Sequence, residues 1–406
     1  MPFSCTELNG IYFIFNKLSG DGEDFEGALR WDISTLLSSS IQATSESCNA
    51  LPLAQGVRFR CRRQKAEALQ RSWLSKLAWG ADQGSLWQVH LWLGVFPVHW
   101  QQVPEAFLLE RQIATIRRNL GGTFTQLLTS MVLDPALQIS LNGPANHRSN
   151  PNENLARELL ELFSLGEGNY SEADVREAAR ALSGYRLNAE QQLVLDPRRH
   201  DFGTKTIMGR STDFNAETLA AWLAEQPATA RHIIGRIWRQ QVGRPPSPQR
   251  LGALASGWRR KQLSIPWLMD AIARAPEAIE SRKKGLRLAD PIEMVARSLR
   301  LLRSRHPDAL AISLRGLQTM GQRPFEPPSV KGWPVNEQWL NLRWLQARRR
   351  SLQALLADEE VWTSRQLPPQ LLATLTPIAP ITVSLPTEPT REHLARLFAD
   401  PVWQLA

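Results

Sequence analysis

The chain has 406 residues and a mass of 45.8 kDa, with 43% hydrophobic and 21% charged residues. This composition is typical of a soluble globular protein that buries a substantial core. No apolar stretch approaches the length of a membrane-spanning helix, so we expect no membrane span.

The N-terminus and the cysteines bear on the compartment. The apolar run at residues 11–15 lacks the basic segment and the small-residue cleavage site of a signal peptide. The three cysteines, Cys5, Cys48 and Cys61, are odd in number and do not have the pattern of a disulfide framework or a metal knuckle. Both observations favour a reducing, cytoplasmic location.

The formal net charge of +9 raises the question of an acidic partner such as nucleic acid. Basic clusters occur at residues 58–65, 282–287, 300–305 and 348–350. Several of these clusters fall on predicted helices that also carry acids, which favours solvated helix faces. Nucleic-acid binding therefore stays an alternative that no motif supports.

Apolar residues recur with helical spacing along most of the chain. This pattern predicts helices at 64–78, 105–120, 154–165, 172–182, 216–224, 228–241, 265–275, 291–303 and 340–356. Strand patterns are scarce, and the best pair, 192–195 with 205–208, predicts one small hairpin. We therefore predict a mainly α, bundle-like globular domain with at most a small β-hairpin.

Composition also predicts the boundaries of this domain. Residues 1–55 are irregular and are interpreted as an N-terminal extension, followed by a helical domain at 56–365. Residues 366–390 are rich in proline, which predicts an extended linker, and residues 391–406 form a C-terminal helix.

The predicted helix at 154–165 has an unusual distribution of side chains. At 100° per residue, its polar residues fall within a sector of about 100°, and apolar residues occupy most of the rest. The polar residues are Asn154, Arg157, Glu158 and Glu161. We expect this helix to lie between other helices with its polar stripe facing a cleft, where Arg157 pairs with Glu161 and Asn154 with Glu158.

The next segment predicts a helical hairpin. Gly166 and Gly168 suit a left-handed helix stop, and Ser171 with Asp174 forms the capping pattern of the following helix. Beyond that helix lies RRHDFGTKTIMG, residues 198–209, which we term the HD loop.

The HD loop is able to reach back over the helical hairpin. If its His200 and Asp201 meet Glu158 and Glu161, the four form a ligand set for a divalent metal or an acid–base pair. Their spacing matches no zinc signature, so three interpretations stay open: a structural polar network, a metal or ligand site, and a catalytic site.

The segment MGQRPFEPPSVKGWP, residues 320–334, is termed the KGW loop. Its prolines fix an extended path, and Gly332 permits close approach of the backbone to a neighbour. The loop is suited to line a pocket with Gln322 and Lys331 as polar tips, or to plug the core with Phe325 and Trp333. We favour the plug for the two aromatic residues.

Four motifs carry a resemblance to a known family. They are NENLARELLELFSLGEGNYSEADVREAARALSGY (152–185), HDFGTKTIMG (200–209), QPATARHIIGRIW (226–238) and the KGW loop. In this order, over about residues 86–348, the chain resembles the bacterial family called domain of unknown function 1800 (DUF1800). The resemblance implies a mostly helical fold, no established enzymatic activity, and a sulfatase-like partner encoded nearby, often in exported systems.

The resemblance also places the polar motif positions of the family on this chain. They are Asn152, Glu153, Asn154, Arg157, Glu158, Glu161, Asp174, Arg180, His200, Asp201 and Lys205, then Gly321, Gln322, Pro324, Lys331, Gly332 and Trp333.

One departure from the family pattern weakens the case for an enzyme. Where the family resembles Trp-His-Asn-His-Phe, this chain has Trp-Leu-Gly-Val-Phe at 92–96, so Leu93 and Val95 replace both histidines. We therefore interpret the protein as a binding or assembly factor with a polar cleft formed by the 154–165 helix, the HD loop and the KGW loop. The alternatives are a metal-dependent enzyme and a nucleic-acid-binding protein.

Overall fold

The computed structural model describes residues 48, 55–304, 306–359, 361 and 371–406. Over these residues the chain is mainly α-helical, as predicted. The helices are α3 (Gln55–Trp79), α4 (Gln83–Val95), α5 (Phe107–Asn119), α6 (Phe124–Val132), α7 (Pro135–Ser140), α8 (Asn154–Glu161), α9 (Glu172–Ala181), α10 (Ala216–Ala224), α11 (Pro227–Val242), α12 (Pro248–Arg260), α13 (Ile265–Ala273), α14 (Pro276–Lys284), α15 (Pro291–Leu302), α16 (Pro307–Thr319), α17 (Leu342–Ala357), α18 (Leu371–Leu375) and α19 (Arg391–Ala399), with 3-10 turns η2 (Gly143–Ala145), η3 (Asn336–Trp339) and η4 (Pro401–Gln404).

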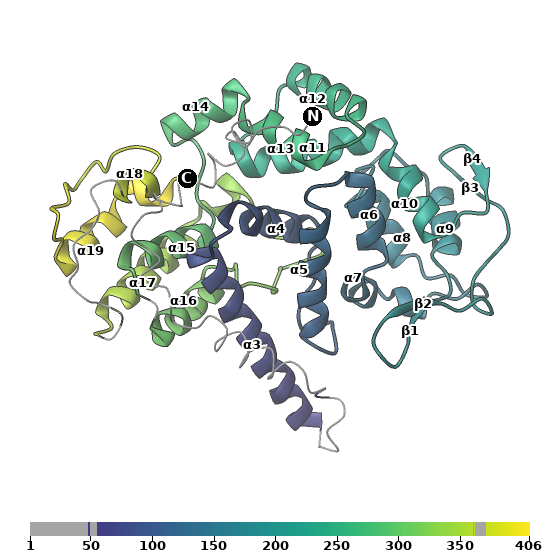
Figure 1. Ribbon diagram of the computed structural model, residues 1–406, viewed down its shortest axis with the longest axis horizontal. Helices are drawn as coiled ribbons and strands as arrows, with labels where there is room; N and C mark the ends of the chain where they lie inside the picture. Colours follow the sequence, from purple (N-terminus) through teal and green to yellow (C-terminus); the bar gives the residue numbers. More distant parts are fainter. Residues whose placement is uncertain (1–47, 49–54, 305, 360, 362–370) are drawn as a thin grey trace, which may run out of the picture.

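The helices form two groups on either side of α4 and α5 (Figure 1). One group holds α15, α16, α17 and α19, and the other holds α6 to α10 with the strands. Helices α11 to α14 lie across the top of the view, and the N-terminal end of α3 extends away from the rest. This arrangement brings α4, α11 and the start of α15 near one another in the middle of the molecule.

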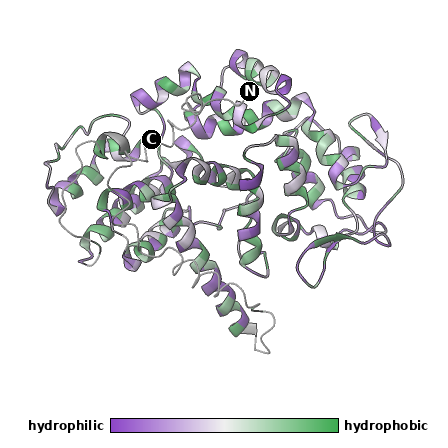
Figure 2. Ribbon diagram, in the orientation of Figure 1, coloured by the Kyte–Doolittle hydropathy of each residue, from purple (hydrophilic) through white to green (hydrophobic). Residues whose placement is uncertain are grey.

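One continuous cluster of buried apolar side chains joins both groups of helices. Its largest members include Trp73, Trp92, Trp238 and Trp258, whose indole rings fill space between the helices. Hydrophobic and hydrophilic residues alternate along most helices (Figure 2), as expected where one face of a helix is buried.

Local signals explain where most helices begin and end. Proline occupies the first turn of α7 and of α11 to α16, where its missing N–H costs nothing. Ser171 and Asp174 form the predicted capping box of α9, and Gly166 (φ 84°) and Gly168 (φ 78°) follow α8 in the left-handed conformation. The sequence pattern missed α4, because most of its residues are buried and its apolar positions therefore show no helical period.

The predicted hairpin of 192–195 with 205–208 is wrong. Strand β1 (Tyr185–Leu187) pairs with β2 (Leu193–Leu195), and β3 (Lys205–Ile207) pairs with β4 (Arg210–Thr212), each antiparallel. The reason is local. Met208 (φ 51°) and Gly209 (φ 75°) form a tight turn that returns the chain onto β3, so a nearer partner is available.

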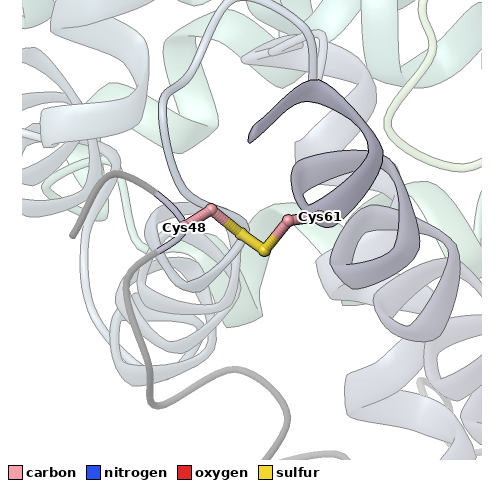
Figure 3. Close-up of a disulfide and its surroundings, with 2 residues drawn as sticks. All are labelled: Cys48 and Cys61. Atoms are coloured by element: carbon pink, nitrogen blue, oxygen red, sulfur yellow. A yellow bond between two sulfur atoms is a disulfide. The ribbon is translucent and has the colours of Figure 1, made fainter. Parts of the chain in front are cut away.

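The expectation that the cysteines form no disulfide is also wrong. Cys48 and Cys61 are bonded, with Cα atoms 5.9 Å apart, which ties the segment before α3 to the helix itself (Figure 3). The odd number of cysteines obscured this pair, whose members are 13 positions apart; the third, Cys5, lies outside the described residues.

The C-terminal segment packs onto the helical body. Helix α19 lies against α17, and the backbone of Leu405 pairs with that of Leu288 before α15. The short helix α18 falls within the range where a linker is predicted. Among the described helices, none has both the length and the apolar character needed to cross a membrane.

Candidate functional site

The KGW loop lies directly against the C-terminal end of α4. Gly332 adopts φ 87°, and a Cβ atom placed there would be 2.6 Å from the carbonyl oxygen of Gly94. The predicted close approach of Gly332 is therefore confirmed, and its neighbour is the helix that carries Leu93 and Val95. Both of these side chains are buried in the core, at 4% and 2% exposure.

Arg236 on α11 connects three elements at this point. Its Nη1 donates to the carbonyl oxygen of Leu162 at 2.8 Å, just after α8, and its Nη2 donates to that of Gly94 at 3.2 Å and, more weakly, to that of Lys331 at 3.5 Å. The partners Leu162 and Gly94 lie at helix C-termini, where partial negative charge favours a cation. Burial lowers the pKa of Arg236 to about 10, and no described carboxylate pairs with it.

A cavity of about 560 Å³ opens beside Arg236, and we term it the cleft. Its walls come from α4, α11, residues 287–290, the KGW loop, η3 and the start of α17. Helix α11 contributes Arg236, Arg239 and Gln240, which are three and four residues apart and so share one helix face. The cleft is large enough for a small organic ligand.

The wall before α15 is held by ionic and capping contacts. Arg287 forms a two-pronged ion pair with Glu293, at 2.9 and 2.7 Å, which raises the pKa of Arg287 against the effect of burial. Asp290 caps α15 by accepting the N–H of Glu293 at 2.8 Å. Burial lowers the pKa of His90, so this cleft residue is neutral at physiological pH.

The edge of the cleft meets the end of α8 through Lys331. Its Nζ lies 3.9 Å from Glu161 Oε1, and the other oxygen of Glu161 accepts the hydroxyl of Tyr170 at 2.9 Å. Burial and the nearby charge of Glu161 raise the pKa of Glu158. The expected meeting of the 154–165 helix with the KGW loop is thus present, through Glu158, Glu161 and Lys331.

The HD loop makes its contacts elsewhere. His200 Nδ1 is 2.7 Å from the carbonyl oxygen of Ser183, and Asp201 forms a two-pronged pair with Arg180 that lowers the pKa of Asp201. Lys205 is fully buried and donates to the carbonyl oxygens of Asp201 and Phe214. These contacts are those of a structural polar network, the simplest of the three interpretations.

The remaining polar residues around α8 and α9 also serve the fold. Arg157 pairs with Glu153 and Glu172 at 3.1 and 2.8 Å, so its predicted partner Glu161 is wrong. The Asp174 side chain accepts the backbone N–H of Ser171 at 2.8 Å in the capping box of α9, and its other oxygen accepts the N–H of Met208 at 2.7 Å, which fixes the turn between β3 and β4.

Within the described part of the chain, the side chains just before and at the start of α8 form hydrogen bonds only with nearby residues. The Asn152 side chain accepts the backbone N–H of Asn154, whose own side chain is exposed. No hydrogen bond joins the side chains of Asn154 and Glu158 among the described residues.

The polar and aromatic residues of the KGW loop have separate roles. Phe325 is buried in the core at 4% exposure, as the plug interpretation predicts. Trp333 is half-buried, faces His90 with ring centroids 6.3 Å apart, and lines the cleft. Gln322 also lines the cleft, but its Oε1 accepts the N–H of Ile292 at 2.9 Å and so holds the start of α15.

The proposed metal ligands do not come together. Glu158 and Glu161 lie at the Lys331 side of α8, whereas His200 and Asp201 are bonded to Ser183 and Arg180. Over the ranges that the structure describes, no group of three or more His, Cys, Asp or Glu side chains is arranged to hold a metal ion.

The sequence did not single out several cleft residues: His90, Arg236, Arg239, Arg287 and Asp290. Arg236 stood within the motif QPATARHIIGRIW, and Arg287 stood in the basic cluster at 282–287. The available signal was that a motif resembling the family continues along α11, but nothing in the sequence shows which of its arginines faces a cavity.

Comparison with known proteins identifies the family alone. A family model described as "Protein of unknown function (DUF1800)" matches residues 23–405, nearly the whole chain. No curated protein and no solved structure matches the chain.

Proposed function

This chain belongs to the DUF1800 family of proteins of unknown function, and we propose that it is a binding protein whose ligand site is the cleft beside Arg236. The observation that carries the proposal is the cavity of about 560 Å³ where the KGW loop meets α4 and α11. The HD loop is outside this site, so the proposed cleft is narrower than the one expected from the sequence.

Two features support binding at this position. The backbone contacts of Arg236 and the close approach of Gly332 fix the walls, so the cavity exists before a ligand arrives. Preformed cavities of this size with a few convergent polar groups are typical of small-molecule sites.

A cavity-filling variant tests the proposal. Gly94 lines the cleft, and a Cβ there meets only the side-chain amide of Gln240, at 3.7 Å. We expect Gly94→Leu to abolish the binding of compounds that a small-molecule screen finds for the wild-type protein. Gly84→Leu is the matched control, because Gly84 lies on the same helix with open space around it. Binding that survives in a folded Gly94→Leu protein, or a screen without hits, overturns the proposal.

A protein partner is a second candidate function, supported by exposed apolar side chains beside the cleft. Leu340, Leu342 and Leu345 are 58%, 72% and 38% exposed, and Trp344 between them lines the cleft. Adjacent exposed apolar residues are typical of an interaction surface. The resemblance to DUF1800 makes the sulfatase-like protein encoded nearby the partner we propose.

Co-purification of the two proteins tests this partner. We expect Leu342→Asp to weaken the complex at least tenfold, because it places a charge in the contact. Ile381→Asp is the control, since Ile381 is 71% exposed at a different place. Absence of a complex, or equal effects of the two variants, excludes this surface.

The disulfide supports an exported location for the protein. Structural disulfides persist in oxidising compartments, so we propose the alternative suggested by the family resemblance over the cytoplasm. Thiol trapping in intact cells tests this: Cys48 and Cys61 should resist alkylation until a reductant is added, and free thiols at these two positions, measured in a Cys5→Ser background, would contradict the proposal.

A further inference from the structure

The charges that line the cleft are strongly unequal. Four cationic side chains face it, from Arg236, Arg239, Arg287 and Lys331, against the single carboxylate of Asp290. Glu293 neutralises Arg287 through their two-pronged pair. The Nζ of Lys331 lies 3.9 Å from Glu161 Oε1, which is a weak contact. Because the Lys331 side chain is 71% exposed, it is free to turn towards the cleft.

The two lining arginines of α11, Arg236 and Arg239, have no carboxylate partner among the described residues. The hydrogen bonds of the Arg236 side chain all go to backbone carbonyl oxygens, and the side chain of Arg239 makes no hydrogen bond or ion pair within the described part of the chain. Arg239 and the amide of Gln240 therefore present N–H donors from one face of α11. A guanidinium group placed in this way matches the oxygens of a phosphate or sulfate group.

The KGW loop and α17 give the cleft a second kind of lining. Trp333 of the KGW loop and Trp344 of α17 line the cleft with indole rings, and His90 lies beside Trp333. Aromatic rings offer large flat surfaces on which the face of a sugar or a base packs. A ligand that satisfies both the cationic and the aromatic lining therefore carries a charged group and a ring.

We propose that the cleft binds a small ligand in which a phosphate or sulfate ester is attached to a ring. Arg239 and Lys331 contact the ester oxygens, and the ring lies against Trp333. This inference rests on the proposed function and adds the chemical class of the ligand. The volume of about 560 Å³ favours a monomeric ligand over a polymer.

Calorimetric titration of the full chain with matched pairs tests the proposal. The pairs are glucose 6-phosphate with glucose, and AMP with adenosine, and inorganic phosphate and sulfate test the anion alone. We expect at least one ester to bind about tenfold or more tightly than its neutral parent, since charge-assisted hydrogen bonds are the stronger ones. Its affinity should fall as salt is added.

Variants locate the binding. Arg239→Gln and Lys331→Gln should each weaken ester binding about tenfold and leave the neutral parents unchanged. Arg231→Gln is the matched control, because Arg231 is exposed on α11 and does not line the cleft. Equal weakening by Arg231→Gln shows diffuse attraction to a basic surface and overturns the proposal.

The outcomes separate this inference from the proposed function. If neutral compounds bind, lose their affinity in Gly94→Leu and gain nothing from an ester, the binding function stands and the ligand class is wrong. If no probe, charged or neutral, shows binding that depends on Gly94, both fail.

Discussion

Replacing Gly332 by alanine tests the contact on which the shape of the cleft depends. Two costs add at this position. The left-handed backbone (φ 87°) costs an alanine about 1 kcal/mol, and relief of a 2.6 Å contact between Cβ and the carbonyl oxygen of Gly94 costs about 1–3 kcal/mol more. We expect the free energy of unfolding to fall by about 2–4 kcal/mol.

A second glycine separates the two costs. Gly168 has nearly the same backbone conformation (φ 78°), and a Cβ there has no neighbour within 4 Å. Gly168→Ala should therefore cost about 1 kcal/mol, from backbone strain alone. Urea denaturation with linear extrapolation gives both values, provided that the slope with denaturant stays the same. Equal losses in the two variants would refute the close approach of the KGW loop to α4.

Three further predictions concern other parts of the fold. Burial raises the pKa of Asp134 from 3.8 to about 7, so the folded state holds a proton that the unfolded chain releases. The free energy of unfolding should then fall by about 1.4 kcal/mol per pH unit between about pH 4 and 7, and Asp134→Asn, which keeps a cap, should remove that slope; an unchanged pH profile contradicts the assignment. Cys61→Ser should lower the free energy of unfolding by about 2–3 kcal/mol, and a reductant should lower that of the wild type equally but leave the variant unaffected. Arg180→Gln should cost about 1–3 kcal/mol by leaving Asp201 without its partner, yet change binding in the cleft less than twofold; a larger change in binding would place the HD loop in the site.

Helix α9 shows how a single buried face makes a helix predictable from the sequence. In α9, Val175, Ala178 and Ala179 are buried while Glu172 and Arg176 are exposed, so the apolar period is visible and the cap at Ser171 fixes the start. Helix α4 lies in the middle of the molecule and is buried on several sides, which removes the period. Burial on several sides thus hides α4, whereas α15, which is also buried along most of its length, keeps a visible apolar period.

The candidate site shows the same limit at the level of side chains. Glu158, Glu161 and Lys331 come together because α8 carries the two acids on one face and its end meets the KGW loop. His200 lies on a loop, and its direction is set by the hydrogen bond that its Nδ1–H donates to the carbonyl oxygen of Ser183. Periodicity predicts neighbours within a helix, but contacts between elements depend on packing.

The basic clusters show why net charge alone is a weak guide to function. In the cluster at 282–287, Arg282 donates to the carbonyl oxygen of Ala273, Lys284 pairs with Glu280, and Arg287 pairs with Glu293. These cations are occupied by neighbours and do not form a free basic surface, which weakens the case for nucleic acid.

Arg239 lies outside every basic cluster, yet no described acid pairs with it and it faces a cavity. A cation without an acidic partner in the free protein contributes more to the affinity for an anionic ligand, because a paired cation must first lose its partner. Ligand binding by this protein is therefore expected at Arg239 beside the cleft and not at the basic clusters, whose density of charge drew attention in the sequence.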